Sequence, residues 1–205
     1  MIELTADNLH LWRGEQHVLR GISFELPAGH CLQVTGANGS GKTTLLRALG
    51  GLVALEEGRV LWRGGDVTRE RAAFHAQLDY LGHDNALKAD LTVAENLRFL
   101  ARLKRPVRDA EVAAALERTG VAECADSLPR HLSAGQRRRA ALARLLLTRG
   151  QLWLLDEPSA NLDARGHRLV VELLAEQLAS GASAVVATHQ ALQLPATQLL
   201  PLALQ

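Results

Sequence analysis

GANGSGKT, residues 36–43, matches the phosphate-loop pattern G-x-x-x-x-G-K-S/T. The apolar run HCLQVT precedes it, and the helical pattern TTLLRALGGL follows it. Glycines let successive backbone N–H groups approach phosphate oxygens, and the N-terminus of the helix adds positive potential. The order of strand, glycine loop and helix therefore predicts a phosphate-binding site. Its candidate binding residues are Gly36, Ala37, Asn38, Gly39, Ser40, Gly41, Lys42, Thr43 and Thr44.

A second segment, QLWLLDEP at residues 151–158, places two carboxylates at the end of an apolar strand. Doubly wound sheets bind their ligands beyond the carboxyl ends of the strands. We expect Lys42 to neutralise the β- and γ-phosphates of a nucleotide, and Thr43 and Asp156 to ligate Mg²⁺. Glu157 is the candidate catalytic base, since it follows Asp156 directly and could orient or deprotonate the attacking water. A nucleotide and Mg²⁺ are thus the expected ligands.

The rest of the chain alternates apolar strands with helical patterns, which predicts an α/β domain with a parallel core sheet. Residues 1–35 indicate short N-terminal strands, and residues 164–179 indicate a helix followed by the strand SAVVATH. Residues 92–134 look mainly helical, with a capping box at Thr92, a cap at Asp109 and a stop at Gly120. We expect one domain, 1–205, with its core in 1–83 and 135–205 and a helical subdomain in about 84–134.

Composition excludes several classes. The chain has 205 residues and a net charge of +1, which argues against a general nucleic-acid binder. A hydrophobic content of 47% excludes a disordered chain. Cys31 and Cys124 lie far apart and are expected to be buried, reduced thiols. Residues 177–205 carry no charged side chain, but Gly181, Pro195 and Pro201 interrupt them, so we expect a buried strand and a short end-piece there rather than a membrane span.

A third motif, LSAGQ at residues 132–136, resembles the LSGGQ signature of ATP-binding cassette (ABC) ATPases, with Ala134 in place of a glycine. SANLD at 159–163 resembles the D-loop of that family. His189 stands where the family has its switch histidine, and Trp12 where an aromatic residue stacks on adenine. The resemblance covers nearly the whole chain. It implies a P-loop NTPase fold with a RecA-like parallel-sheet core, antiparallel N-terminal strands and a helical subdomain.

The family resemblance also implies a homodimer, in which two chains bind head to tail around two ATP molecules. Ser133, Ala134, Gly135 and Gln136 of one chain would face the γ-phosphate held by the phosphate loop of the other. Ser133 and Gln136 also form a capping-box pattern, so both roles can hold together. Catalysis would depend on Glu157, His189 and Lys42, with His189 contacting the γ-phosphate or the water. Arg137-Arg138-Arg139 is expected to be the positive flank of this phosphate-facing helix.

One position departs from the family pattern. ABC domains carry a glutamine nine residues before the Thr of a T-V-x-E-N segment, and here that position is His83. Imidazole can still accept a hydrogen bond from water or ligate a metal; alternatively, the contact is absent. His83, LSAGQ and the basic residues after it resemble the ATP-binding subunits of the bacterial cytochrome c maturation haem exporter. That resemblance implies separate membrane subunits of the CcmB and CcmC type and a peripheral place on the cytoplasmic side of the inner membrane.

Other functions remain as alternatives. The chain could be the ATPase of an exporter for another substrate, such as a lipoprotein or an antibiotic. A soluble ABC protein acting on DNA or ribosomes is disfavoured, because Lys42 and Leu132 are only about 90 residues apart, which leaves no room for a long coiled coil, and because the chain holds one cassette. A scaffold without ATPase activity would lack catalytic residues that this sequence contains. No residue is expected to ligate haem iron, so the substrate rests on resemblance.

Overall fold

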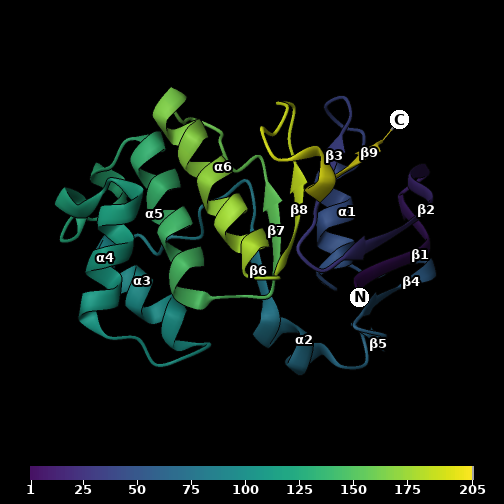
Figure 1. The fold of residues 1–205 in the computed structure, drawn as a ribbon, viewed down its shortest axis with the longest axis horizontal. Helices are drawn as coiled ribbons and strands as arrows, with labels where there is room; N and C mark the ends of the chain where they lie inside the picture. The colour runs from purple at the N-terminus through teal and green to yellow at the C-terminus, as the bar shows by residue number, and fades with distance from the viewer. Residues whose placement is uncertain (205) are drawn as a thin grey trace.

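The computed structural model describes residues 1–204 and contains two β-sheets with helices packed around them (Figure 1). The smaller sheet is antiparallel with strand order β2-β1-β4-β5, and the larger is parallel with order β6-β7-β8-β3-β9. The strands are β1 (Ile2–Arg13), β2 (Gln16–Pro27), β3 (Cys31–Thr35), β4 (Glu57–Trp62), β5 (Gly65–Asp66), β6 (Leu78–Leu81), β7 (Leu152–Asp156), β8 (Ser183–Ala187) and β9 (Leu199–Ala203). The helices are α1 (Lys42–Leu49), α2 (Arg71–Gln77), α3 (Val93–Arg102), α4 (Asp109–Thr119), α5 (Ala134–Thr148) and α6 (Ala164–Ala179), with short 3₁₀ turns at Ala122–Cys124, Pro129–His131 and Ala196–Gln198. The predicted α/β class is confirmed.

The parallel sheet is covered on both faces, which explains why its central strands are apolar throughout. Side chains alternate along β7, so Leu152 and Leu154 pack with α1 and the antiparallel sheet. Trp153 and Leu155 point the other way and pack with α5 and α6. Every residue of β7 and β8 is buried. The phosphate loop, which joins β3 to α1, therefore starts from an interior strand of a sheet that is covered on both faces.

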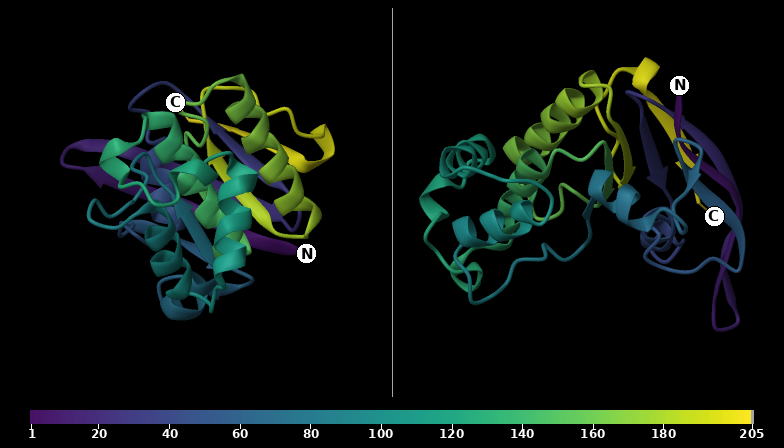
Figure 2. Two further views of the ribbon diagram at one scale, coloured as in Figure 1. Left: turned by 90° about the vertical axis from the view of Figure 1, so that its left-hand side faces the viewer. Right: turned by 90° about the horizontal axis from the view of Figure 1, so that it is seen from below.

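A separate apolar cluster holds the helical part of the chain together. It joins α3 and α4 to one side of α5, whose other side packs on the parallel sheet. Figure 2 shows α3 and α4 at the end of the molecule far from β1 and β2. The Thr92 capping box is present, and Gly120 ends α4 with φ 70°. The N-cap of α4 is Arg108, so the cap predicted at Asp109 is wrong by one residue; Asp109 lies in the first turn and accepts from Arg98 Nε at 2.6 Å.

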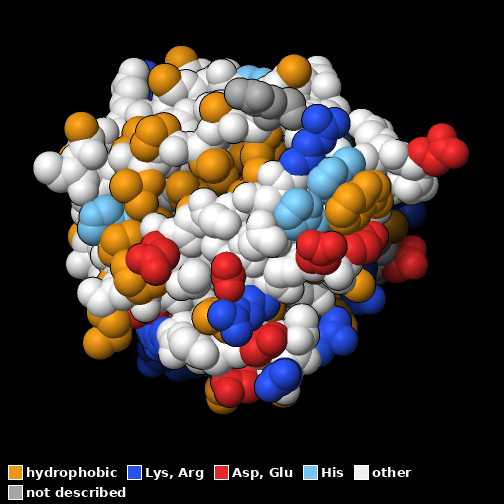
Figure 3. All heavy atoms as spheres, turned by 90° about the vertical axis from the view of Figure 1, so that its right-hand side faces the viewer, with side chains coloured by type: hydrophobic (Ala, Val, Ile, Leu, Met, Phe, Trp, Pro, Cys, Tyr) orange, Lys and Arg blue, Asp and Glu red, His pale blue; other side chains and the backbone are white. Residues whose placement is uncertain are grey.

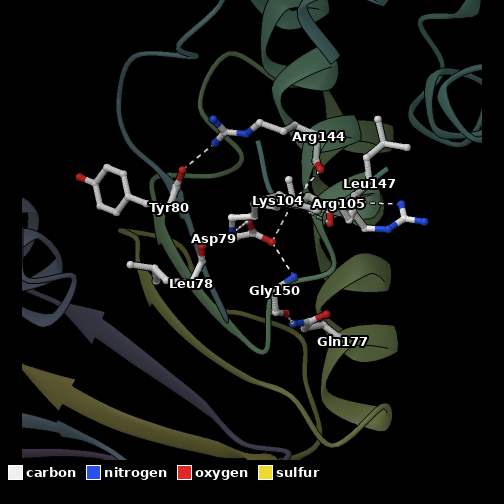
Figure 4. Close-up of polar contacts among 11 residues, drawn as sticks. Leu78, Asp79, Tyr80, Lys104, Arg105, Arg144, Leu147, Gly150 and Gln177 are labelled. Atoms are coloured by element: carbon white, nitrogen blue, oxygen red, sulfur yellow. Dashed lines mark hydrogen bonds and ion pairs between the residues drawn. The ribbon is translucent and has the colours of Figure 1, made fainter. Parts of the chain in front are cut away.

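Polar contacts centred on Asp79 hold this helical part against edge strand β6 (Figure 4). The buried Asp79 carboxylate accepts from Lys104 Nζ at 2.6 Å, Thr148 Oγ1 at 2.8 Å and the Gly150 N–H at 2.8 Å. Lys104, just beyond α3, also donates to the Leu78 carbonyl. These bonds fix the segment after α3 and the end of α5 to one strand.

The uncharged C-terminal stretch contains more structure than predicted. Besides β8 it forms β9, which pairs in parallel with β3 at the edge of the sheet. Pro201 is tolerated there because an edge strand need not donate on both sides. The prediction of only a short end-piece was wrong, since the partner of β9 lies over 160 residues away and leaves no local signal. Within residues 1–204, the helices lack the combination of length and apolar character that membrane crossing requires.

The other differences are small. β1 and β2 are 12 residues each, longer than the short strands expected for residues 1–35. Cys31 and Cys124 are free and buried, as predicted, and burial raises the pKa of Cys31 to about 12.

Candidate active site

The phosphate loop needs its glycines for conformation and for space. Gly36, Gly39 and Gly41 have φ values of 150°, 83° and 97°, a region that other residues rarely adopt. A Cβ on Gly41 would lie 2.8 Å from Val18 Cγ1, and a Cβ on Gly36 would lie 2.5 Å from Ser40 Oγ. The loop therefore packs tightly between β2 and its own residues, and its path is fixed.

Lys42 lies across the loop that carries it. Its Nζ donates to the carbonyls of Gly36 and Ala37 at 2.8 and 3.1 Å. The same Nζ lies 3.4 Å from His189 Nε2, although the two residues are 147 positions apart. The lysine charge thus sits between the glycine loop and the end of β8, where the phosphates of a nucleotide would lie.

The acidic pair at the end of β7 completes this edge of the sheet. Thr43 Oγ1 donates to Asp156 Oδ2 at 2.7 Å, so the two predicted metal ligands are adjacent. Glu157 has φ 46°, and its N–H donates to the Ala187 carbonyl at 2.8 Å. Glu157 Oε1 lies 3.5 Å from His189 Nε2 and makes no hydrogen bond within residues 1–204. A buried carboxylate oxygen without a donor can accept a proton from a reacting group.

The His189 loop is held from β3. Gln33 Nε2 donates to the Gln190 carbonyl at 2.9 Å, and the Thr188 N–H donates to the Val34 carbonyl at 3.1 Å. Gln33 is a buried polar residue within an apolar strand, and this bond satisfies it. These bonds from β3 hold the loop so that His189 lies next to Glu157.

These residues surround one cavity of about 420 Å³. The predicted residues that line it are Asn38, Gly39, Gly41, Lys42, Thr43, Thr44, His83, Asp156, Glu157 and His189. Gly36, Ala37 and Ser40 belong to the loop but do not line the cavity. Arg13, Gln16 and Val18 also line it and were not predicted, because nothing in a hairpin of ordinary strand residues marks them.

Trp12 precedes Arg13, which lines the cavity, but Trp12 does not line it. Its ring stacks on His17 of the neighbouring strand, with the ring centroids 3.7 Å apart and the planes 6° from parallel. Figure 3 shows histidine side chains beside a hydrophobic side chain on the face that carries β1 and β2. Stacking on adenine stays a prediction for Trp12.

The signature segment begins α5 and does not line the cavity of its own chain. The predicted capping box is present: Ser133 Oγ accepts from the Gln136 N–H at 3.1 Å, and Gln136 Oε1 accepts from the Ser133 N–H at 2.8 Å. Ser133 and Ala134 are exposed, while a Cβ on Gly135 would lie 2.9 Å from the Asn161 carbonyl. The start of this helix therefore faces outward, where a second molecule could reach it.

The arginines that follow do not form a uniform basic flank. Arg138 is only 2% exposed, so the prediction that it belongs to the positive flank of the phosphate-facing helix is wrong for that residue. Arg139 is partly buried, and its Nη2 lies 2.9 Å from the Asp163 carboxylate, the N-cap of α6. Hydrogen bonding to the Gly166 N–H, with Arg139 nearby, lowers the pKa of Asp163.

Comparison with known proteins agrees with this geometry. Residues 19–160 match the family model of the ABC transporter. A protein of Methylococcus capsulatus named cytochrome c biogenesis ATP-binding export protein CcmA is 46% identical over 190 residues, which cover 92% of both chains. A protein of the same name from Nitrosococcus oceani is 44% identical over 93% of this chain and 88% of its own length.

Solved structures show the same fold. The ATP-binding subunit of an ABC transporter superposes with a TM-score of 0.83 and 26% identity, over 91% of this chain and 79% of its own. A dimeric ATP-binding cassette in a post-hydrolysis state, bound to ADP and Pi, superposes with a TM-score of 0.83 at 24% identity, over 91% and 88%. By its fold, its phosphate loop and its family match, the chain belongs to the ATPases of the ABC transporter family.

Proposed function

We propose that this chain is the ATP-hydrolysing subunit of a membrane complex for cytochrome c maturation, which exports haem or releases the haem-loaded chaperone. The observation that carries this proposal is the similarity to CcmA proteins over nearly the full length of both chains. A local feature supports it, because His83, the departure from the family pattern, lines the cavity with Lys42 and Glu157. These relatives are named for cytochrome c biogenesis and export. Haem as the substrate follows from the resemblance to the ATP-binding subunits of the haem exporter.

The side chains around the cavity suit hydrolysis of ATP. Lys42 would pair with the β- and γ-phosphates, and the loop N–H groups would bind their oxygens. Glu157 would accept a proton from the attacking water, and His189, 3.5 Å from it, would hold the water or the γ-phosphate. His83 enters the cavity from the end of β6, where it could bind the same water.

The donor set also fits Mg²⁺. Thr43 and Asp156 bring a hydroxyl and a carboxylate oxygen within 2.7 Å of each other beside the lysine. Mg²⁺ prefers oxygen ligands and is commonly held by one or two side chains together with phosphates and water. When bound, the ion would neutralise charge on the β- and γ-phosphate oxygens. Thr43 and Asp156 are the side chains that would hold it.

Two copies are proposed to share the two sites. Ser133 and Ala134 are exposed and lie outside the cavity of their own chain, as expected if they contact ATP on a second copy. The N-terminus of α5 offers free N–H groups and a positive dipole end to a phosphate. Homodimer closure upon ATP binding would move the helical part of each chain relative to its core. The ATPase dimer would lie on the cytoplasmic side of the inner membrane and transmit this motion to membrane subunits of the CcmB and CcmC type.

Gene replacement in a cytochrome c-producing host tests the proposal. A strain that lacks the gene should lose holo-cytochrome c, measured by haem-stained gels. The wild-type chain should restore it, and Lys42→Ala should not, although the variant accumulates equally. A six-helix membrane protein should copurify with the chain. Normal cytochrome c in the deletion strain, together with a defect in another export process, would favour the alternative of an exporter for lipoprotein or antibiotic.

A further inference from the structure

Arg138 carries a charge in the interior of the molecule. The residue lies on α5 and is 2% exposed. A guanidinium has five N–H groups, and burial is tolerable only when they are paired. Burial lowers the pKa of Arg138 to about 10, while the nearby Asp156 and Glu157 carboxylates raise it, so the side chain stays charged at neutral pH.

The five hydrogen bonds of Arg138 reach two separate segments around the cavity. One segment lies at the end of β7 and carries Asp156 and Glu157; the other follows β6 and carries His83. The acceptors are the carbonyls of Asp156 (2.6 Å), Glu157 (2.7 Å), Pro158 (3.1 Å) and Gly82 (2.8 Å), and Asn85 Oδ1 (3.1 Å). A single side chain therefore fixes the distance between these two segments and the signature helix.

Glu157 needs such support because its backbone is strained. Its φ of 46° is in the left-handed region, which costs free energy for a residue with a Cβ. The Glu157 carbonyl accepts from Arg138 Nη2 at 2.7 Å and from the Ala160 N–H at 2.9 Å. This backbone conformation brings the carboxylate to 3.5 Å from His189. Without Arg138, the peptide group after Glu157 would lose its charged donor and could relax.

We propose that Arg138 is a positioning residue for hydrolysis: it holds the backbone of Glu157 so that the carboxylate faces the cavity, and it ties that backbone to the His83 segment and to the signature helix. This inference rests on the proposed role of Glu157 as the base. Arg138 itself does not line the cavity. It acts through Glu157. It also links Glu157 to the start of α5 in the same chain, which is the surface proposed to bind the ATP of a second copy.

The test compares Arg138→Gln with a matched substitution on the same helix. Arg144 is a partly buried arginine of the same helix, and its Nη2 donates to the Tyr80 carbonyl at 2.6 Å rather than to the Glu157 segment (Figure 4). Arg138→Gln should lower kcat by at least about tenfold, because small displacements of a reacting group are costly. Its affinity for a fluorescent ATP analogue should stay within about threefold of wild type, whereas Arg144→Gln should keep kcat within about twofold.

Two further variants distinguish positioning from mere folding. Arg138→Lys keeps the charge and some of the hydrogen bonds, so it should recover part of the lost kcat and serves if Arg138→Gln does not fold. In a Glu157→Gln background, Arg138→Gln should cause no further loss of activity. Wild-type kcat in Arg138→Gln, or equal losses of kcat and stability in Arg138→Gln and Arg144→Gln, would overturn the inference. Wild-type hydrolysis by Glu157→Gln would instead overturn the proposed function.

Discussion

At the scale of single residues, charged groups of both signs crowd the end of the parallel sheet. His189 Nε2 lies 3.4 Å from Lys42 Nζ and 3.5 Å from Glu157 Oε1, an oxygen with no hydrogen bond within residues 1–204. Such an arrangement is costly for folding alone and useful for catalysis. Each side chain can therefore be tested by a variant that separates binding from turnover.

Glu157→Gln should leave only a small residual turnover while ATP binding remains. The amide keeps the shape of the side chain but cannot accept the proton of water, and loss of a general base costs on the order of a hundredfold or more. Phosphate release measures kcat, and a fluorescent ATP analogue measures affinity. Lys42→Ala is the contrasting variant, since it should weaken binding as well. A Glu157→Gln variant with wild-type turnover would show that another group is the base.

Gly41→Ala should disrupt the phosphate loop itself. An alanine at this position would have to adopt φ 97°, and its Cβ would lie 2.8 Å from Val18 Cγ1. The loop would therefore have to move. We expect ATP affinity to fall at least about tenfold, because the loop N–H groups lose their alignment. Gly181→Ala is the control, as Gly181 has φ 86° but open space around its Cβ position, far from the loop in sequence. Equal ATP affinity in both variants would refute this account of the loop.

At the scale of elements, β6 and α5 form the junction between the sheet and the helical cluster. α5 contributes Arg144 to the Tyr80 carbonyl and Thr148 to the Asp79 carboxylate. Lys104, beyond α3, contacts the same strand. Side chains thus satisfy the polar groups of an edge strand that would otherwise be open to pairing.

Lys104→Met should lower the free energy of unfolding by about 3 kcal/mol, since it leaves the Asp79 charge buried with only neutral donors. The Asp79 carboxylate is 5% exposed, so water cannot replace the lysine. Arg69→Met removes a surface ion pair whose arginine is 87% exposed, and should change stability by less than about 0.5 kcal/mol. Urea unfolding measures both. Similar small changes in the two variants would show that the buried pair contributes little.

Glu111, in the first turn of α4, should make a pH-dependent contribution to the stability of the fold. The hydrogen bond from Arg105, together with the Arg108 N–H, lowers the pKa of Glu111 from 4.5 to about 2. A lowered carboxylate pKa means that stability is present above the unfolded value and is lost as pH falls towards the folded one. Glu111→Gln should therefore lower Tm at about pH 6, and the difference from wild type should shrink as pH falls below about 4. A difference that is independent of pH would contradict this explanation.

Local sequence patterns predicted the helices and most strands well, but they did not predict features that depend on contacts between residues far apart in sequence. The capping boxes at Thr92 and Ser133 and the stop at Gly120 depend on neighbours within four residues, and all three are present. Strand β9 depends on a partner far away in sequence and was missed. Arg138, one of three consecutive arginines, could not be singled out as buried, because its carbonyl acceptors come from segments that only the fold brings together.

At the scale of the whole molecule, the proposed homodimer would divide each ATP site between two chains. The cavity holds Lys42, Glu157 and His189, while the signature residues face outward at the start of α5. In a head-to-tail dimer, a chain with a damaged phosphate loop would still contribute an intact signature. A chain with a damaged signature would still contribute an intact phosphate loop. Two inactive variants should then restore activity when they are mixed, which no site confined to one chain would allow.

The ATPase rate of an equimolar mixture of Lys42→Ala and Ser133→Arg is therefore the most direct measurement. Each variant alone should be inactive, because both of its sites lack one half. In the mixture, about half of the dimers would be mixed and each would hold one complete site, so the rate should recover to about a quarter of wild type. A mixture no more active than either variant alone would contradict the shared site.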